Sequence, residues 1–203
     1  APRPFHESHP LRSSRSMKND LRAFGAELLA TNHVGRIERM LELGRSARTD
    51  ARALRELDEL ARGDVFERRL AIFALQSLRD GGRLLPFTED ASAKLRSLAF
   101  RLVQRICDDV QALEALKVAH TLRRDRALLV QLSARGRRGV VDRYLDWLAD
   151  RPGLHDFADL VPLATTDGVR RHLERALARP SLVFWDRLAR SAPDALGAVL
   201  EER

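Results

Sequence analysis

DVFERRLAIFALQSLRDGGRLLPFTEDASAKLRSLAFRLVQRICDD, residues 64–109, contains two helical segments that are close copies of each other. Four residues of the first segment have counterparts in the second at a constant offset of 28 positions (96 − 68): Arg68, Leu70, Ala71 and Leu78 correspond to Arg96, Leu98, Ala99 and Ile106. The acidic turn residue after the first segment, Asp80, has its counterpart in Asp108 at the same offset. A helix repeated at a fixed spacing predicts a stack of helical repeats.

The ends of these segments can also be read from the sequence. Asp64, with Glu67 three residues later, has the spacing of a capping box, so a helix is expected to begin there. Each copy is followed by a shorter apolar return element, at residues 84–87 and 110–119, and Pro86 keeps the first of these short. A third copy is irregular. Arg124 and Ala127 keep the offset of 28, whereas three leucines fit an offset of 30 better: Leu128, Leu129 and Leu132.

This pattern resembles HEAT-like repeat proteins. Its elements are an arginine followed three residues later by alanine, then leucine, an aspartate at the turn and a second apolar helix. The resemblance covers residues 64–120 well and the rest of the chain in a general way, although HEAT units usually run longer, nearer about 40 residues. It implies an all-α, right-handed α-solenoid of irregular HEAT-like helix pairs.

Around the repeats, residues 1–16 hold three prolines and four serines without a helical period, which predicts a disordered tail. Residues 17–203 are then expected to form a single HEAT-like helical domain with about ten or eleven helices in all. Asn32 and Asp50 are suitable N-caps for two of them, and the helix that Asn32 begins is expected to end near Gly44.

Composition narrows the class of protein further. Aromatic residues make up only 5% of the chain and charged residues 32%, and Val/Ile-rich alternating runs are missing, so strands are not expected. The longest apolar run, residues 70–75, is far shorter than the roughly 18 residues that a membrane span needs. Cys107 is the single cysteine, which fits a reducing compartment. A cytoplasmic protein without membrane contact is therefore expected.

The basic balance of the chain suggests a possible nucleic-acid partner. Residues 65–139 carry 15 basic and 8 acidic side chains, so most of the net charge of +7 lies in the middle of the sequence. Arginine is suited to bidentate contact with phosphate. The candidate residues for binding a partner or nucleic acid are Arg68, Arg96, Arg124, Arg126, Arg135, Arg137 and Arg138. The first three are equivalent in the repeat at the offset of 28 and are expected to form a ladder in a regular stack.

Catalytic and metal-binding patterns are weak, and neither a catalytic residue, a metal site nor a cofactor is expected. His155, Asp156 and Asp159 lack a second cluster that would complete a ligand set. Cys107 ends an apolar stripe, which favours a small packed residue over a nucleophile. Asp146-Trp147 and Trp185-Asp186 invite comparison with HEAT-like DNA glycosylases, but they match only two residue types.

The sequence therefore favours a non-enzymatic interaction scaffold that presents a curved helical-repeat surface to a protein partner. A nucleic-acid-binding module that uses an arginine-rich face is the alternative, and a DNA-glycosylase-like repair enzyme is the third choice. The first expectation follows from fold class rather than from a site, since one repeat fold can serve many functions.

Overall fold

The computed structural model describes residues 26, 28, 30–149, 157–178 and 185–201. Within these residues the chain is helical and contains no strand, so the predicted all-α class is confirmed. Ten of the described α-helices run for seven residues or more, while α5 and α10 are single turns of four residues. None of the described helices has the length and the apolar character needed to cross a bilayer. The predicted tail at residues 1–16 lies outside the described residues.

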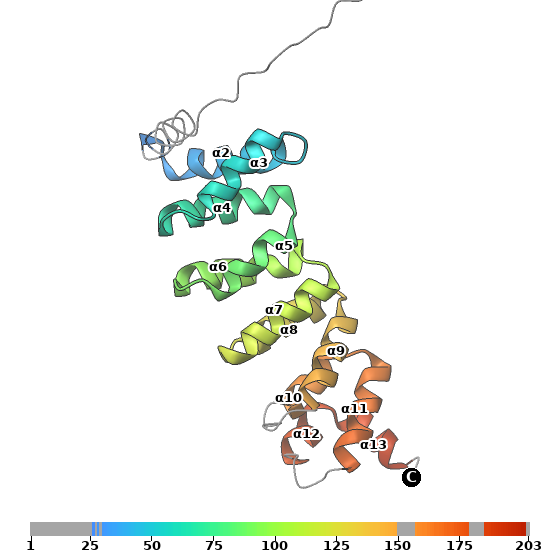
Figure 1. The fold of residues 1–203 in the computed structure, drawn as a ribbon. Helices are drawn as coiled ribbons and strands as arrows, with labels where there is room; N and C mark the ends of the chain where they lie inside the picture. The colour runs from blue at the N-terminus through green and yellow to red at the C-terminus, as the bar shows by residue number, and fades with distance from the viewer. Residues whose placement is uncertain (1–25, 27, 29, 150–156, 179–184, 202–203) are drawn as a thin grey trace, which may run out of the picture. The chain divides into compact units, whose positions relative to one another are not determined.

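The chain divides into two compact units, residues 1–78 and 79–203, which are described separately. The first contains helices α2 (His33–Ser46), α3 (Ala51–Leu60) and α4 (Val65–Leu78) (Figure 1). The expected caps are present: Asn32 accepts from the Gly35 amide, and Asp50 accepts from the Arg52 amide. Before α4, the Asp64 and Glu67 side chains each accept from the other residue's backbone N–H, at 2.9 and 2.8 Å. The predicted capping box is confirmed.

The helix that was expected to end near Gly44 ends two residues later, at Ser46, and Gly44 lies inside it as a contact point. A Cβ atom at this position would stand 1.9 Å from the carbonyl oxygen of Ala74 and 2.3 Å from Oγ of Ser77, both in α4. The Ser77 hydroxyl donates to the carbonyl of Leu41 at 2.6 Å, which ties the same two helices together. Helices α2 and α4 therefore approach each other at backbone distance, and the helix continues to Ser46.

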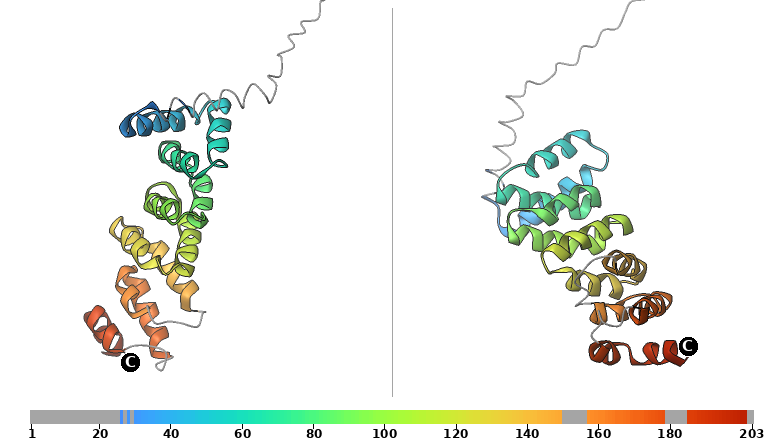
Figure 2. Two further views of the ribbon diagram at one scale, coloured as in Figure 1. Left: turned by 90° about the vertical axis from the view of Figure 1, so that its left-hand side faces the viewer. Right: turned by 60° about the horizontal axis from the view of Figure 1, so that its bottom comes forward.

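The second unit is built in two layers. One contains α6 (Ala93–Ile106), α8 (Asp125–Ala134), α10 (Phe157–Leu160) with the 3-10 helix η3 (Val161–Leu163), and α12 (Trp185–Ser191). The other contains α5 (Gly81–Leu84) with the 3-10 helix η1 (Leu85–Glu89), α7 (Asp109–Thr121), α9 (Arg138–Ala149), α11 (Thr166–Ala178) and α13 (Pro193–Glu201). The left-hand view in Figure 2 shows α6 and α8 stacked beside α7 and α9.

The repeated aspartates have the same task in the structure. Asp80 caps α5 by accepting from the Arg83 amide, and Asp108 caps α7 in a capping box with Gln111. Asp80 and Gly81 therefore begin the return element, which runs through η1 to Glu89 and is longer than the predicted residues 84–87. Pro86 nevertheless limits it to one α-helical turn and a 3-10 helix, as the sequence indicates.

The third copy of the repeat follows the offset of 30. Leu129, the counterpart of Ala99 at this offset, is fully buried, as Ala99 is. Ala127, the counterpart at the offset of 28, is exposed. Between α6 and α8 the chain therefore inserts two residues relative to the first spacing. The solenoid arrangement and the single domain over residues 17–203 stay predictions.

His172 in α11 gives the second unit a predictable response to pH. It is fully buried, and this burial lowers the pKa of its imidazole to about 4, although Asp146 opposes the shift. The unfolded chain therefore takes up a proton first as the pH falls. Stability from this residue is complete above about pH 6.5 and is lost between there and pH 4, by up to about 3 kcal/mol.

We expect denaturation midpoints of the wild-type protein to fall between pH 7.5 and pH 5, and the His172→Gln variant to lose most of that fall. Glutamine is polar and of similar size but does not titrate. The difference between the two proteins isolates His172 from the carboxylates. An equal fall in both proteins would contradict the prediction.

Candidate functional site

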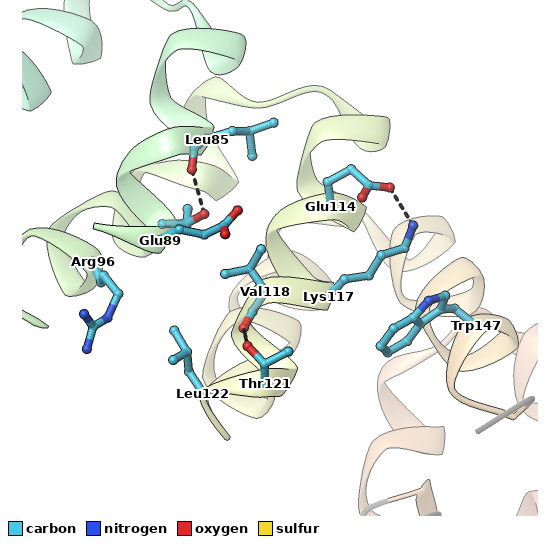
Figure 3. Close-up of a pocket in the computed structure, with 10 residues that line it drawn as sticks. Leu85, Glu89, Arg96, Glu114, Lys117, Val118, Thr121, Leu122 and Trp147 are labelled. Atoms are coloured by element: carbon cyan, nitrogen blue, oxygen red, sulfur yellow. Dashed lines mark hydrogen bonds and ion pairs between the residues drawn. The ribbon is translucent and has the colours of Figure 1, made fainter. Parts of the chain in front are cut away.

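A groove of about 620 Å³ runs along helix α7 in the second unit. Helix α7 and its C-cap residue Leu122 supply half of the lining residues, η1 and Arg96 of α6 lie on one side, and Trp147 of α9 lies on the other (Figure 3). We call it the α7 groove. Its lining residues are Leu85, Thr88, Glu89, Arg96, Glu114, Lys117, Val118, Thr121, Leu122 and Trp147.

The groove combines an apolar floor with a charged rim. Four apolar side chains from three elements line it: Leu85, Val118, Leu122 and Trp147. On the rim, Lys117 forms an ion pair with Glu114 at 2.6 Å, and Glu89 and Arg96 contribute one charge of each sign. The α7 residues recur at intervals of three and four, so they face one side of the helix over two turns, about 11 Å.

The short return element accounts for this open side of α7. Because α5 and η1 are brief, this side of α7 packs against the 3-10 helix η1 instead of a full-length helix. Thr88 stabilises the last turn of η1, since its hydroxyl donates to the Leu85 carbonyl at 2.7 Å. Phe87 is buried and anchors η1. The groove therefore follows from Pro86 and the 3-10 geometry, and of the predicted binding residues Arg96 lines it.

Trp147 is held in place by a polar cluster behind the groove, in which Tyr144 and Asp125 are buried and His120 is partly exposed. The Tyr144 hydroxyl donates to the Asp125 carboxylate, and Nδ1 of His120 lies 3.1 Å from the same carboxylate and 3.0 Å from the Tyr144 oxygen. The indole of Trp147 stacks on Tyr144 at 5.6 Å between ring centroids and meets His120 edge-on at 5.5 Å. The cluster joins α7, α8 and α9 and fixes the ring that closes the groove. The cluster could not be predicted from the sequence, because its members come together only when the three helices pack.

Arg68 and Arg96, two of the predicted binding residues, donate to the backbone just before their own helices. Each is the fourth residue of its helix, α4 or α6, and each donates to the carbonyl five residues earlier, at 2.8 Å to Gly63 and 2.9 Å to Ala91. Arg36, the fourth residue of α2, does the same to Thr31 at 2.9 Å. These arginines hold the entry loops of their helices. Arg124 has a different position, since it is the N-cap residue of α8 and is exposed.

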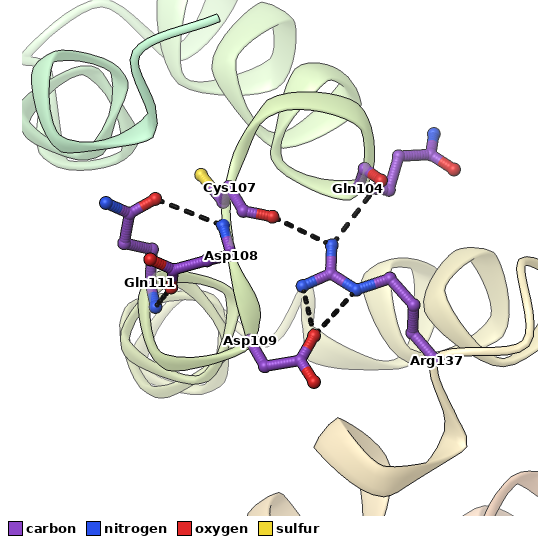
Figure 4. Close-up of polar contacts among 6 residues, drawn as sticks. All are labelled: Gln104, Cys107, Asp108, Asp109, Gln111 and Arg137. Atoms are coloured by element: carbon purple, nitrogen blue, oxygen red, sulfur yellow. Dashed lines mark hydrogen bonds and ion pairs between the residues drawn. The ribbon is translucent and has the colours of Figure 1, made fainter.

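Arg137 also forms its bonds within the fold, at the junction of α6 and α7 (Figure 4). Its guanidinium donates to the Asp109 carboxylate at 2.7 and 3.0 Å and to the Cys107 carbonyl at 3.0 Å. It also reaches the Gln104 carbonyl at 3.5 Å. Arg137 therefore satisfies carbonyls at the C-terminal end of α6 that no helical amide reaches.

The other predicted arginines lie nearer to solvent. Arg126 is 3.5 Å from the Asp159 carboxylate, and Arg135 donates to the Gln104 side chain at 2.7 Å. Arg138 is exposed, and within the described part of the chain neither it nor Arg124 has a side-chain partner. The structure thus separates the predicted set into loop-holding and solvent-facing arginines, and binding by any of them stays a prediction.

The residues considered as a nucleophile, as metal ligands or as glycosylase-like acids are buried or ion-paired wherever the structure describes them. Cys107 is buried at the end of α6, and this burial raises the pKa of its thiol to about 11. Asp146 pairs with Arg171 and Arg175, and Asp186 with Arg190, so the acids of both Asp–Trp pairs are engaged. His155 and Asp156 lie outside the described residues, while Asp159 lies 3.5 Å from Arg126 and from Arg187. Among the residues that the structure describes, no group of three or more His, Cys, Asp or Glu side chains could hold a metal ion.

No protein-family model matches the sequence, and the comparisons found neither a matching curated protein nor a matching solved structure.

Proposed function

We propose that the protein is a non-enzymatic, HEAT-like interaction scaffold that binds a segment of a protein partner in the α7 groove. The observation that carries this proposal is the apolar floor of Leu85, Val118, Leu122 and Trp147, which comes from three elements and is open to solvent. A pre-positioned tryptophan in such a groove is the kind of residue that dominates binding energy in protein interfaces. The polar cluster beside the tryptophan supports the proposal, because His120, Asp125 and Tyr144 bond to one another and so hold the Trp147 ring in position.

The form of the groove indicates what its occupant should present. It is elongated along two turns of α7, which suits a short peptide segment better than a globular surface. The floor calls for an apolar anchor that packs against Val118 and Trp147. The rim carries Glu89 and Glu114 as well as Arg96 and Lys117, so the anchor should be flanked by residues of both charges.

Peptides selected from a random display library on the wild-type protein test this proposal. We expect them to share an apolar anchor and to bind the Val118→Asp variant at least about tenfold more weakly, a loss of about 1.4 kcal/mol. Aspartate places a charge on the floor of the groove, where an apolar anchor would have to cover it. Titration calorimetry gives the two dissociation constants.

Val110→Asp is the matched control, because Val110 is 63% exposed on the same helix and does not line the groove. It makes the same change of side chain and charge. Affinity equal to wild type is expected for this variant. Peptides that bind all three proteins equally, or a selection that returns no binder, would contradict the proposal.

A further inference from the structure

Helices α6 and α8, in the other layer from helix α7, carry a surface with several cations and no anion. Lys94, Arg101 and Arg105 are exposed and lie on one face of α6, since they are separated by seven and four residues. The neighbouring helix adds Arg124 before its first residue and Arg135 after its last. We call this surface the α6–α8 face. It consists of Lys94, Ser97, Arg101, Gln104, Arg105, Arg124, Ala127, Gln131 and Arg135.

Side-chain contacts join the two helices into one continuous face. The amide of Gln104 in α6 donates to the Gln131 side chain of α8 at 3.0 Å, and Arg135 donates to Gln104 at 2.7 Å. These bonds place the C-terminal ends of α6 and α8 side by side, with Arg101 and Arg105 next to Arg135. Arg124 is seven residues before Gln131 and so extends the same side of α8.

The cations of this face are not neutralised within the fold. Lys94, Arg101, Arg105 and Arg124 have no ion pair or side-chain hydrogen bond anywhere in the described part of the chain, and Arg135 bonds only to the uncharged Gln104. Of the carboxylates nearest in sequence, Glu89 lines the α7 groove, and four others are engaged elsewhere. Asp90 accepts from the Ser92 amide, Asp108 caps α7, and Asp109 pairs with Arg137. Asp125, the one acid of α8, is buried against Tyr144.

We propose that the α6–α8 face binds double-stranded nucleic acid through its phosphates. Five unpaired cations around neutral polar residues complement a polyanion, and arginine matches phosphate geometry. Lys94 and Arg105 are eleven residues apart on α6, so they span about 16 Å, roughly the reach of five phosphates along one duplex strand. The face contains no aromatic residue on which unpaired bases could stack, which favours a duplex over a single strand. Its contacts carry no base readout, so binding is independent of sequence.

Binding of a labelled 20-base-pair DNA duplex at 50 to 200 mM salt, followed by fluorescence anisotropy, tests this face. Five phosphate contacts should give a log–log slope of about −4 to −5, and the triple variant R101Q/R105Q/R135Q should reduce its magnitude by about 2 to 3. The melting temperature of this variant should stay near that of the wild type, because all three side chains are exposed. A single strand of the same length should bind more weakly than the duplex.

R170Q/R187Q/R190Q is the control with the same change in net charge, at exposed arginines of α11 and α12 that face carboxylates. It should keep the wild-type slope, and so should Val118→Asp, whose substitution lies in the α7 groove. Equal loss in both triple variants would mean attraction by net charge alone and would overturn the proposal. Absence of duplex binding at 50 mM salt would overturn the proposal too. Displacement of the duplex by polyglutamate at equal charge concentration would also overturn it, and would assign the face to an acidic protein.

Discussion

Gly44→Ala should destabilise the first unit by about 3 kcal/mol or more and lower its melting temperature by about 10 °C or more. The added Cβ would lie 1.9 Å from the Ala74 carbonyl oxygen and 2.8 Å from its carbonyl carbon. Both are backbone atoms of α4, so a side-chain rotation cannot relieve the overlap. Helices α2 and α4 must move apart, which also weakens the 2.6 Å bond between Ser77 and Leu41. Thermal and urea unfolding measure the loss.

Gly197→Ala is the control of opposite sign. Gly197 also lies inside a helix, α13, but a Cβ atom there would meet nothing within 4 Å. Alanine should therefore stabilise that helix by up to about 1 kcal/mol, as its higher helix propensity indicates. If Gly44→Ala were as well tolerated as Gly197→Ala, the close approach of α2 and α4 would be wrong.

Gly44 also illustrates which parts of the fold could be predicted from the sequence. Local capping signals were sufficient at Asn32, Asp50 and the Asp64–Glu67 pair, because the bonding partners lie within three residues. A glycine near a helix end is ambiguous, since it can end the helix or admit a neighbour. Only the position of Ala74, thirty residues away, decides between the two.

The candidate site was predicted less well, for two physical reasons. The α7 groove is formed by the space beside a short return element. Pro86, which shortens this element, can be recognised in the sequence, but the groove that results cannot. Trp147 was noticed only for its neighbour Asp146, which pairs instead with Arg171 and Arg175. The polar cluster that orients Trp147 joins His120, Asp125 and Tyr144 across three helices.

The arginines show a different limit of sequence reasoning. Repetition at a fixed offset suggested a binding ladder for Arg68 and Arg96, yet the repetition has a local cause. Both are the fourth residue of a helix and hold a carbonyl of the preceding loop, as Arg36 does in α2. Counting from each helix start would have separated them from the solvent-facing arginines. Recurrence in a repeat therefore indicates a shared structural task as readily as a shared ligand.

Leu129→Asp should unfold or severely destabilise the second unit, by about 4 kcal/mol or more, whereas Ala127→Asp should change stability by less than about 0.5 kcal/mol. Leu129 is fully buried, and the carboxylate of Asp125 lies one turn before it, so a second acid would be both desolvated and repelled. Ala127 is exposed in the first turn of α8, where the helix dipole favours an acid.

Leu129→Ala extends this comparison to a variant that still folds, with an expected loss of about 2 to 5 kcal/mol from the cavity. Urea midpoints of the three variants then order the positions by burial. The two possible offsets predict opposite orders, because an offset of 28 places Ala127 at the buried position of Ala99, and an offset of 30 places Leu129 there. A larger loss for Ala127→Asp than for Leu129→Asp would restore the regular repeat. The expected order would instead support a two-residue insertion between α6 and α8. This insertion leaves Arg124 at the N-cap of α8 and out of register with Arg96.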